Sequence, residues 1–151
     1  MLSNSRPRVL CVDDDEDSRV MLINLLREAL IEAKAVGTAA QALSMIQTER
    51  FDLYLLDGWL PDFDGFELCR QMRAFDPLTP ILFFSGAAYE TDKKRGIEAG
   101  ANAYVVKPDV NEMIGSITRL VSEAESATAK IIPFRPKISF SPAFTFEPAA
   151  A

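Results

Sequence analysis

Carboxylate, hydroxyl and ammonium side chains stand directly after short apolar segments of this sequence. The side chains placed in this way are Asp13, Asp14, Asp57, Ser85 and Lys107. Carboxylates packed close together repel one another, and a hard divalent cation removes that cost. Oxygen ligands with few charges favour Mg²⁺, which keeps some of its waters and so leaves room for phosphate oxygens. The residue types therefore suit a magnesium site that handles a phosphoryl group.

Phosphoryl transfer requires a nucleophile, a metal ion and fixed positive charge around the transferred group. Asp57 is the candidate nucleophile, because a carboxylate can form an acyl phosphate. The ammonium group of Lys107 can neutralise one phosphoryl oxygen, and the hydroxyl of Ser85 can donate to another. A single aspartate after a strand more often caps a helix or closes a turn. The prediction rests on the joint occurrence of these residues in this order.

Short apolar segments alternate with helical patterns five times along the chain. We expect strands at residues 9–12, 34–36, 53–56, 81–84 and 103–106. Apolar residues at helical spacing predict helices over residues 22–30, 39–46, 66–73, 90–99 and 110–121. This alternation predicts an α/β fold, a doubly wound five-stranded parallel sheet of flavodoxin-like order. The carboxyl ends of parallel strands share one edge, which brings the polar side chains around one crevice.

Composition excludes several classes of protein. The chain has 151 residues, 48% of them hydrophobic, and a net charge of −6, which argues against a general affinity for nucleic acid. No apolar segment approaches the roughly 18 residues of a membrane span, and the polar start is no secretion signal, so we expect a cytoplasmic protein. The lack of histidine excludes histidine-based catalysis and a phosphohistidine carrier. Cys11 and Cys69 lie in apolar patterns and are expected to be buried thiols.

The composition changes near the C-terminus. We expect residues 1–128 to form one domain and residues 129–151 a tail rich in proline and phenylalanine, with no separate effector domain. Proline opposes helix, and four phenylalanines are many for a solvated linker. Three interpretations stay open: an anchor on its own domain, a peptide ligand for another protein, or a poorly ordered terminus. So short a tail is too small for a DNA-binding effector domain, which favours output through protein–protein contact.

Four segments carry a resemblance to a known family. They are Val9–Asp15, Leu55–Gly65, Ile81–Gly86 and Ala99–Pro108. With them the chain resembles the response-regulator receiver (CheY-like) family over about residues 7 to 126. The resemblance implies a receiver domain of a two-component phosphorelay. Such a domain takes a phosphoryl group from a sensor histidine kinase or a histidine phosphotransfer protein. It then signals to another protein, as a phosphoacceptor switch and not as a turnover enzyme.

The resemblance also implies a role for each residue at the predicted metal site. Asp13 and Asp14 match the acidic pair that holds Mg²⁺ in the family. Asp57 matches the phosphorylated aspartate, which is also a metal ligand. Trp59 matches the position whose backbone carbonyl completes the protein ligands. On this basis Mg²⁺ is the expected cofactor.

Three further residues match the family's switch. Lys107 matches the lysine that contacts the phosphoryl group, and its bond to Pro108 is expected to be cis. Ser85 matches the switch hydroxyl. Tyr104 matches the aromatic switch residue, which turns inward when that hydroxyl moves toward the phosphoryl group. The segment 90–99 and the final helix would then present a different surface to a partner.

The chain departs from the family's pattern at three positions. Gly86 stands where alanine is usual, so the loop after the fourth strand is expected to be more flexible. Asp109 stands where phenylalanine is common, which weakens packing but provides an N-cap for the final helix. Trp59 places a large ring beside the acceptor. It either shields the acyl phosphate from water or is half-exposed and neutral.

Two other functions compete with the switch. The first is an adaptor on the same fold that binds its partner without phosphorylation, and the intact acid pair, Asp57 and Lys107 argue against it. The second is a metal-dependent phosphatase of another α/β family with an aspartyl nucleophile. Those enzymes carry the nucleophile after the first strand, whereas here it follows the third.

Overall fold

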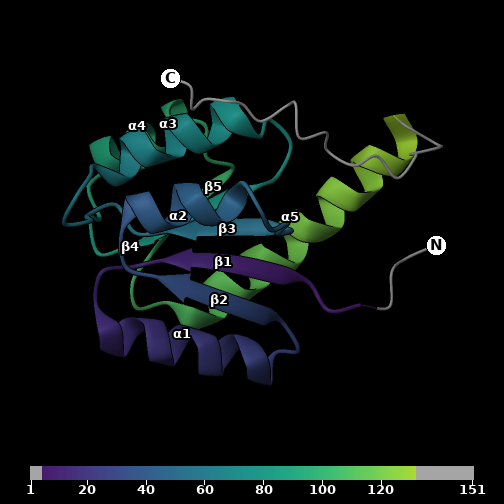
Figure 1. Ribbon diagram of the computed structural model, residues 1–151, viewed down its shortest axis with the longest axis horizontal. Helices are drawn as coiled ribbons and strands as arrows, with labels where there is room; N and C mark the ends of the chain where they lie inside the picture. Colours follow the sequence, from purple (N-terminus) through teal and green to yellow (C-terminus); the bar gives the residue numbers. More distant parts are fainter. Residues whose placement is uncertain (1–4, 132–151) are drawn as a thin grey trace.

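Five parallel strands form one sheet in the computed structural model of the chain (Figure 1). Residues 5–131 are described, with their side chains up to residue 127. The strand order is β2-β1-β3-β4-β5, so the predicted doubly wound parallel sheet is confirmed. The strands are β1 Arg8–Val12, β2 Glu32–Val36, β3 Leu53–Leu56, β4 Ile81–Ser85 and β5 Ala103–Val106. The helices are α1 Glu16–Glu28, α2 Ala39–Ile46, α3 Gly65–Phe75, α4 Glu90–Glu98 and α5 Val110–Ile131.

Helices cover both faces of the sheet (Figure 1). Helices α1 and α5 lie on one face, and α2, α3 and α4 lie on the other. Alternate strand residues enter two separate cores, because successive side chains of a strand point to opposite faces. In β1, Leu10 and Val12 join the core with α2 and α3, while Val9 and Cys11 join the core with α1 and α5. The central strands are therefore apolar on both faces, which is why their apolar segments are unbroken.

The predicted end of the first helix and the predicted start of the second strand differ from the structure. Strand β2 begins at Glu32, two residues before the predicted start, because its outer residues alternate between exposed and half-buried and so give no apolar segment. The predicted apolar stripe of the first helix included Leu30, and this was wrong. Helix α1 ends at Glu28, and Leu30 follows with a φ of 64° and an exposed side chain. Ile31 is buried instead.

Aspartates begin the first and last helices. Asp15 caps α1 and its carboxylate accepts a hydrogen bond of 2.8 Å from the backbone N–H of Ser18. Asp109 accepts one of 3.0 Å from the N–H of Glu112, which confirms it as a cap of α5. Helix α5 continues to Ile131 and so enters the range 129–151, whose remainder lies outside the described residues.

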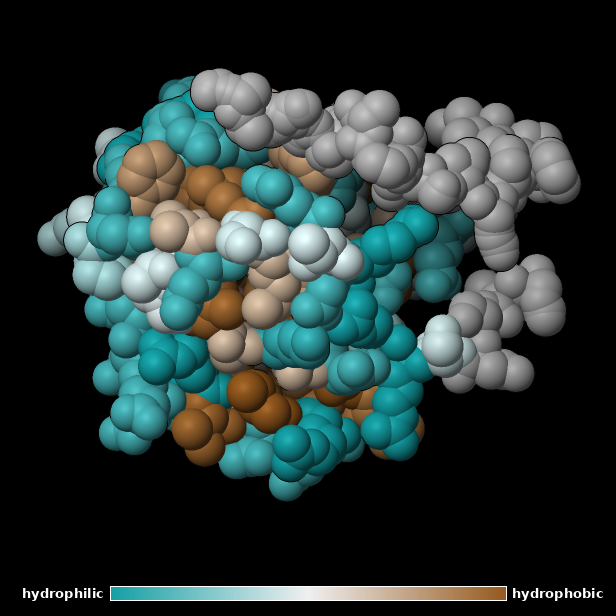
Figure 2. Space-filling model, viewed as in Figure 1, coloured by the Kyte–Doolittle hydropathy of each residue, from teal (hydrophilic) through white to brown (hydrophobic). Residues whose placement is uncertain are grey.

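Exposed apolar side chains are dispersed on the described surface. Figure 2 shows brown apolar residues scattered among teal hydrophilic ones on the face seen in Figure 1. Exposed examples lie on α1, on loops and on α4: Val20, Leu30, Leu78 and Ile97. Single exposed apolar residues are normal on a protein surface. Within residues 5–131 no helix is long and apolar enough to cross a membrane. Both Cys11 and Cys69 are buried free thiols, as predicted.

Candidate functional site

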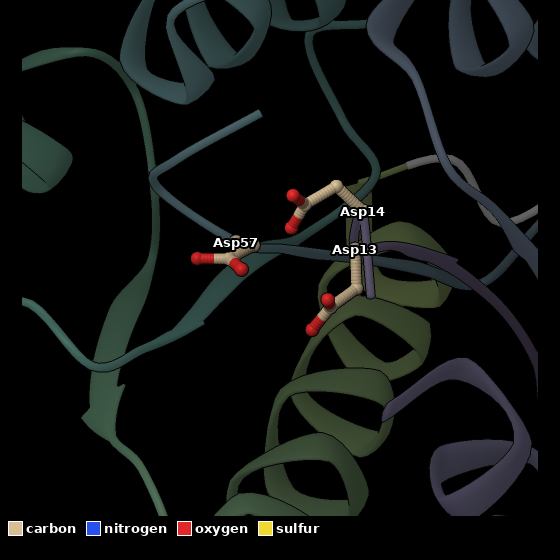
Figure 3. Close-up of side chains that lie close together, drawn as sticks. All are labelled: Asp13, Asp14 and Asp57. Carbon is tan, nitrogen blue, oxygen red and sulfur yellow. The ribbon is translucent and has the colours of Figure 1, made fainter. Parts of the chain in front are cut away.

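Three carboxylates meet where β1 and β3 end (Figure 3). One oxygen from each of Asp13, Asp14 and Asp57 lies within 4.8 Å of the other two. The side chains of Asp13 and Asp57 are buried, while that of Asp14 is exposed. Asp14 makes no hydrogen bond or ion pair within the part of the chain that the structure describes. The arrangement offers oxygen ligands to a cation from two neighbouring strand ends.

The pairing of β1 with β3 explains this meeting. Val12 lies opposite Leu56 in the parallel register, so the residues that follow leave the sheet at the same level. The N–H of Asp57 donates a hydrogen bond of 3.0 Å to the carbonyl of Val12, which extends the ladder by one residue. Two aspartates far apart in the sequence are thereby held side by side by backbone hydrogen bonds.

Lys107 joins the acidic cluster from the end of β5. Its ammonium group lies 2.8 Å from Asp13 Oδ2 and 3.4 Å from Asp57 Oδ2. The bond between Lys107 and Pro108 is cis, as the sequence resemblance implied. The backbone N–H of Lys107 donates to the carbonyl of Ser85, 2.9 Å away. Lys107 therefore supplies fixed positive charge at the same strand edge as the three carboxylates.

The close packing of these charges shifts their pKa values. Burial raises the pKa of Asp57, and the charge of Asp13 adds to this rise, against the opposing effects of Lys107 and of the N–H of Trp59. Burial alone would lower the pKa of Lys107, but its hydrogen bond to Asp13 and the charges of Asp57 and Asp13 raise it. A second cation at the cluster would favour the ionised form of Asp57, the form that can act as a nucleophile. The donor set therefore fits Mg²⁺.

Two glycines allow α3 to begin directly beside the acceptor. The N–H of Gly65 donates a hydrogen bond of 3.2 Å to the carbonyl of Gly58. A Cβ on Gly65 would lie 2.8 Å from Gly58 Cα and would also meet the carbonyl oxygen of Asp57. A side chain at Gly58 would come within 3.3 Å of Ser85 Oγ. The absence of side chains here lets the main chain of the loop fold tightly against the end of β3.

Ser85 and Tyr104 are linked through Ala87. The buried Ser85 Oγ accepts a hydrogen bond of 3.2 Å from the N–H of Ala87. The hydroxyl of Tyr104 donates one of 2.7 Å to the carbonyl of the same residue. The ring of Tyr104 stacks on Phe83 at 5.5 Å between centroids. A movement of the Ser85–Ala87 loop therefore changes the hydrogen bond of Tyr104 directly.

The aromatic contacts continue from Tyr104 toward α3. Phe83 lies 5.0 Å from Phe66, and the guanidinium group of Arg95 on α4 lies 4.1 Å above the Phe66 ring. Arg95 also forms an ion pair of 3.0 Å with Asp64, the N-cap of α3. Helix α4 has a weak apolar stripe, and Gly96 is its one buried residue. Arg95 attaches it to α3 through a cation over a ring and an ion pair, which an apolar pattern does not reveal.

Trp59 lies two residues after Asp57. Its backbone N–H donates a hydrogen bond of 3.2 Å to Asp57 Oδ1, and the residue pairs with Asp64 in an isolated antiparallel bridge. Its side chain is 60% exposed, so the indole lies largely in water near the acceptor. This exposure is compatible both with a ring that shields the acyl phosphate from water and with a neutral surface ring.

Sequence reasoning missed Arg19 at this site. Its Nη1 atom donates a hydrogen bond of 2.9 Å to the main-chain carbonyl of Asp13. A basic residue in the first helix, six positions after the first aspartate, was the one available signal. A bond to a main-chain atom places no demand on the residue type of its acceptor, so the pattern of side chains did not point to it.

We predict that Gly86→Ala stabilises the protein. Outside Gly86 and its two chain neighbours, no described atom lies within 4 Å of a Cβ built on Gly86, and its φ is outside the left-handed region. Alanine then reduces the conformational entropy of the unfolded chain at no steric cost, worth about 0.4–1 kcal/mol. Urea unfolding of the variant and the wild type measures the difference. A lower midpoint would mean that the loop uses backbone conformations that only glycine adopts.

Comparison with known proteins identifies the family. The family model of the response regulator receiver domain matches residues 9–118. The chain belongs to this family. Two curated relatives are a DNA-binding response regulator MtrA from Mycolicibacterium smegmatis and the transcriptional regulatory protein GltR from Pseudomonas aeruginosa. They are 33% and 34% identical over 87% and 83% of this chain, and over 58% and 52% of their own length. The chain thus spans about half the length of these relatives.

Solved receiver domains have the same fold. A CheY-like receiver domain protein from Methanospirillum hungatei matches with a TM-score of 0.77 and 30% identity, over 82% of this chain and 99% of its own. The receiver domain of sensor histidine kinase PA1611 from Pseudomonas aeruginosa matches with a TM-score of 0.72 and 26% identity, over 78% and 99%. That structure contains a magnesium ion coordinated in its active site cleft.

Proposed function

We propose that this receiver domain accepts a phosphoryl group on Asp57, with Mg²⁺ held by Asp13, Asp14, Asp57 and the backbone carbonyl of Trp59. One observation carries the proposal. Three carboxylates from two strand ends lie within 4.8 Å of one another, and Lys107 bonds two of them. A cluster of this kind needs more positive charge than one lysine supplies. The magnesium ion in the related PA1611 receiver domain supports the choice of metal.

Each residue has a separate task in this proposal. Asp57 attacks the phosphorus atom through a carboxylate oxygen, and the bond to the donor's nitrogen or oxygen breaks. Asp13 and Asp14 hold the ion, which when bound neutralises charge on the phosphoryl oxygens. Lys107 exchanges its contact with Asp57 for a phosphoryl oxygen. Its ammonium group already lies 3.4 Å from that carboxylate, so a small movement is enough.

The response to phosphorylation passes through Ser85. The new phosphoryl group adds charge and three acceptor oxygens, which draw the Ser85 hydroxyl away from Ala87. The Ser85–Ala87 loop then moves, and Tyr104 changes its hydrogen bond to the Ala87 carbonyl. The surface formed by α4 and β5 changes in consequence. Phosphorylation in this way biases an element with two states.

The partners we propose are proteins. A sensor histidine kinase or a histidine phosphotransfer protein supplies the phosphoryl group in the cytoplasm, and a protein target reads the altered surface. The relative MtrA is a DNA-binding response regulator, and the match to this chain covers 58% of its length. The net charge of −6 of the present chain disfavours binding to the phosphate backbone of nucleic acid, so we propose no nucleic acid partner for it.

Intact mass tests the function. The protein is incubated with acetyl phosphate in Mg²⁺ and, in parallel, after removal of divalent ions with a chelator. We expect a gain of one phosphoryl group with Mg²⁺ and none without it. No gain in either sample, repeated with a phosphorylated histidine kinase as donor, would favour an adaptor that works without phosphorylation.

We predict that Trp59→Ala shortens the lifetime of the phosphorylated protein. Trp59 follows the acceptor by two residues, and we expect its indole to cover the acyl phosphate against water in the wild type. The rate of loss of the phosphoryl group, followed by mass after the donor is removed, measures the effect. Tyr89→Ala is the control, because Tyr89 is an aromatic residue that is 79% exposed on the N-terminal side of α4. An unchanged lifetime in Trp59→Ala would leave the ring as a neutral surface residue.

A further inference from the structure

Arg19 connects α1 to the loop that carries the acidic pair. The Nη1 atom of Arg19 donates to the main-chain carbonyl of Asp13, 2.9 Å away. This carbonyl belongs to the peptide group between Asp13 and Asp14. On the other side of Asp13, its N–H donates to the carbonyl of Val36 at 3.1 Å. The main chain of the loop is therefore held from two directions, by β2 and by Arg19.

The guanidinium group fits against a glycine of the next loop. A Cβ built on Gly37 would lie 2.7 Å from Arg19 Nη1 and 3.3 Å from its Cζ. Gly37 stands between β2 and α2, and its N–H donates to the side chain of Gln41. Arg19 thus fills the space between the loop after β1 and the loop after β2. A side chain at Gly37 would displace it.

The contact of Arg19 with the Asp13 carbonyl bears on Asp14, the next residue of the chain and a member of the acidic cluster. The carboxylate of Asp14 has no partner in the described chain, so the main chain alone sets its direction. The carboxylate of Asp13, by contrast, is held by Lys107 and by the N–H of Asp15 at 3.0 Å. Fixing the peptide group before Asp14 fixes the direction in which its side chain leaves the main chain.

We propose that Arg19 is a positioning residue that orients Asp14 toward the metal and is itself held in place by the absence of a side chain at Gly37. The inference rests on the function proposed above. Arg19 could affect Mg²⁺ binding through its charge or by orienting Asp14, and these two effects predict opposite changes in the dissociation constant when Arg19 is removed. A nearby guanidinium repels Mg²⁺, so its removal would tighten binding if charge were its main effect. If Arg19 acts by orienting Asp14, its removal weakens binding.

The test measures the dissociation constant of Mg²⁺ for four proteins. They are the wild type, Arg19→Met, Gly37→Ala and Arg27→Met. Trp59, the single tryptophan of the chain, reports binding by its fluorescence because its backbone N–H bonds the Asp57 carboxylate; calorimetry gives an independent value. Arg27→Met is the matched control, since Arg27 is an exposed arginine in the last turn of the same helix.

We expect Arg19→Met to raise the dissociation constant roughly tenfold, the usual effect of losing a residue that orients a metal ligand. Gly37→Ala keeps the charge but displaces the guanidinium, so it should raise the constant as well. Arg27→Met should match the wild type. Unchanged or tighter binding in both Arg19→Met and Gly37→Ala overturns the inference and leaves the proposed function intact. A wild type that binds no Mg²⁺ overturns both. If Arg19→Met does not fold, as seen by circular dichroism, Gly37→Ala decides alone.

Discussion

Asp57→Asn should abolish the gain of a phosphoryl group that the wild type shows with Mg²⁺ and acetyl phosphate. An amide is a poor nucleophile and cannot form the acyl phosphate, while its size and shape match the carboxylate. The variant should still fold. Because burial raises the pKa of Asp57, its ionised form costs stability at neutral pH, and loss of that charge should raise the thermal midpoint. Intact mass and thermal unfolding measure the two effects.

The control for this variant is Asp17→Asn. Asp17 is an exposed acid in the first turn of α1, and its replacement should leave the gain in mass unchanged. Asp57→Asn protein that still gains one phosphoryl group at the rate of the wild type would show that another carboxylate is the acceptor. Asp13 and Asp14 would then be the next residues to replace. A lower thermal midpoint would show that the contact between Lys107 and Asp57 stabilises the fold by more than the burial of the Asp57 charge destabilises it.

Strands with an unbroken apolar segment could be read from the sequence. Residues 53–56 and 103–106 were predicted with their observed bounds, and residues 81–84 lacked only Ser85. The same reasoning was less accurate for the edge strand β2, since its exposed positions Glu32 and Lys34 are charged and interrupt the apolar pattern. Helix periodicity also extended past the true end of α1, because Leu30 continues the apolar spacing although its backbone has left the helix.

The chemical groups of the site were recognised, but not what holds them. Asp13, Asp57 and Lys107 could be placed together because the ends of parallel strands share one edge. The contacts that set their geometry run through main-chain atoms. Ala87 links Ser85 to Tyr104 through its N–H and its carbonyl, which any residue possesses. Residue type carries no information on such bonds, so they became visible only in three dimensions.

Gly65→Ala should destabilise the protein by about 3 kcal/mol, because a methyl group has no space there. The Cβ would lie 2.8 Å from Gly58 Cα and would press on the carbonyl of Asp57, and neither main-chain atom can move aside cheaply. The start of α3 must then shift away from the end of β3. Since the strained atoms belong to Asp57 and its neighbour, the variant should also gain the phosphoryl group more slowly under conditions where it remains folded.

Gly115→Ala is the matched control for this loss. Gly115 lies inside α5, and apart from its chain neighbours and the backbone of its own helix, no described atom lies within 4 Å of a Cβ built on it. Alanine in a helix interior is favoured over glycine by about 1 kcal/mol, so the control should be more stable than the wild type. Urea unfolding of both variants measures the two changes in stability, which should have opposite signs. If Gly65→Ala were as stable as the wild type, α3 could retreat from Asp57 at no cost. The close approach of the two segments would then not be what holds the acceptor in place.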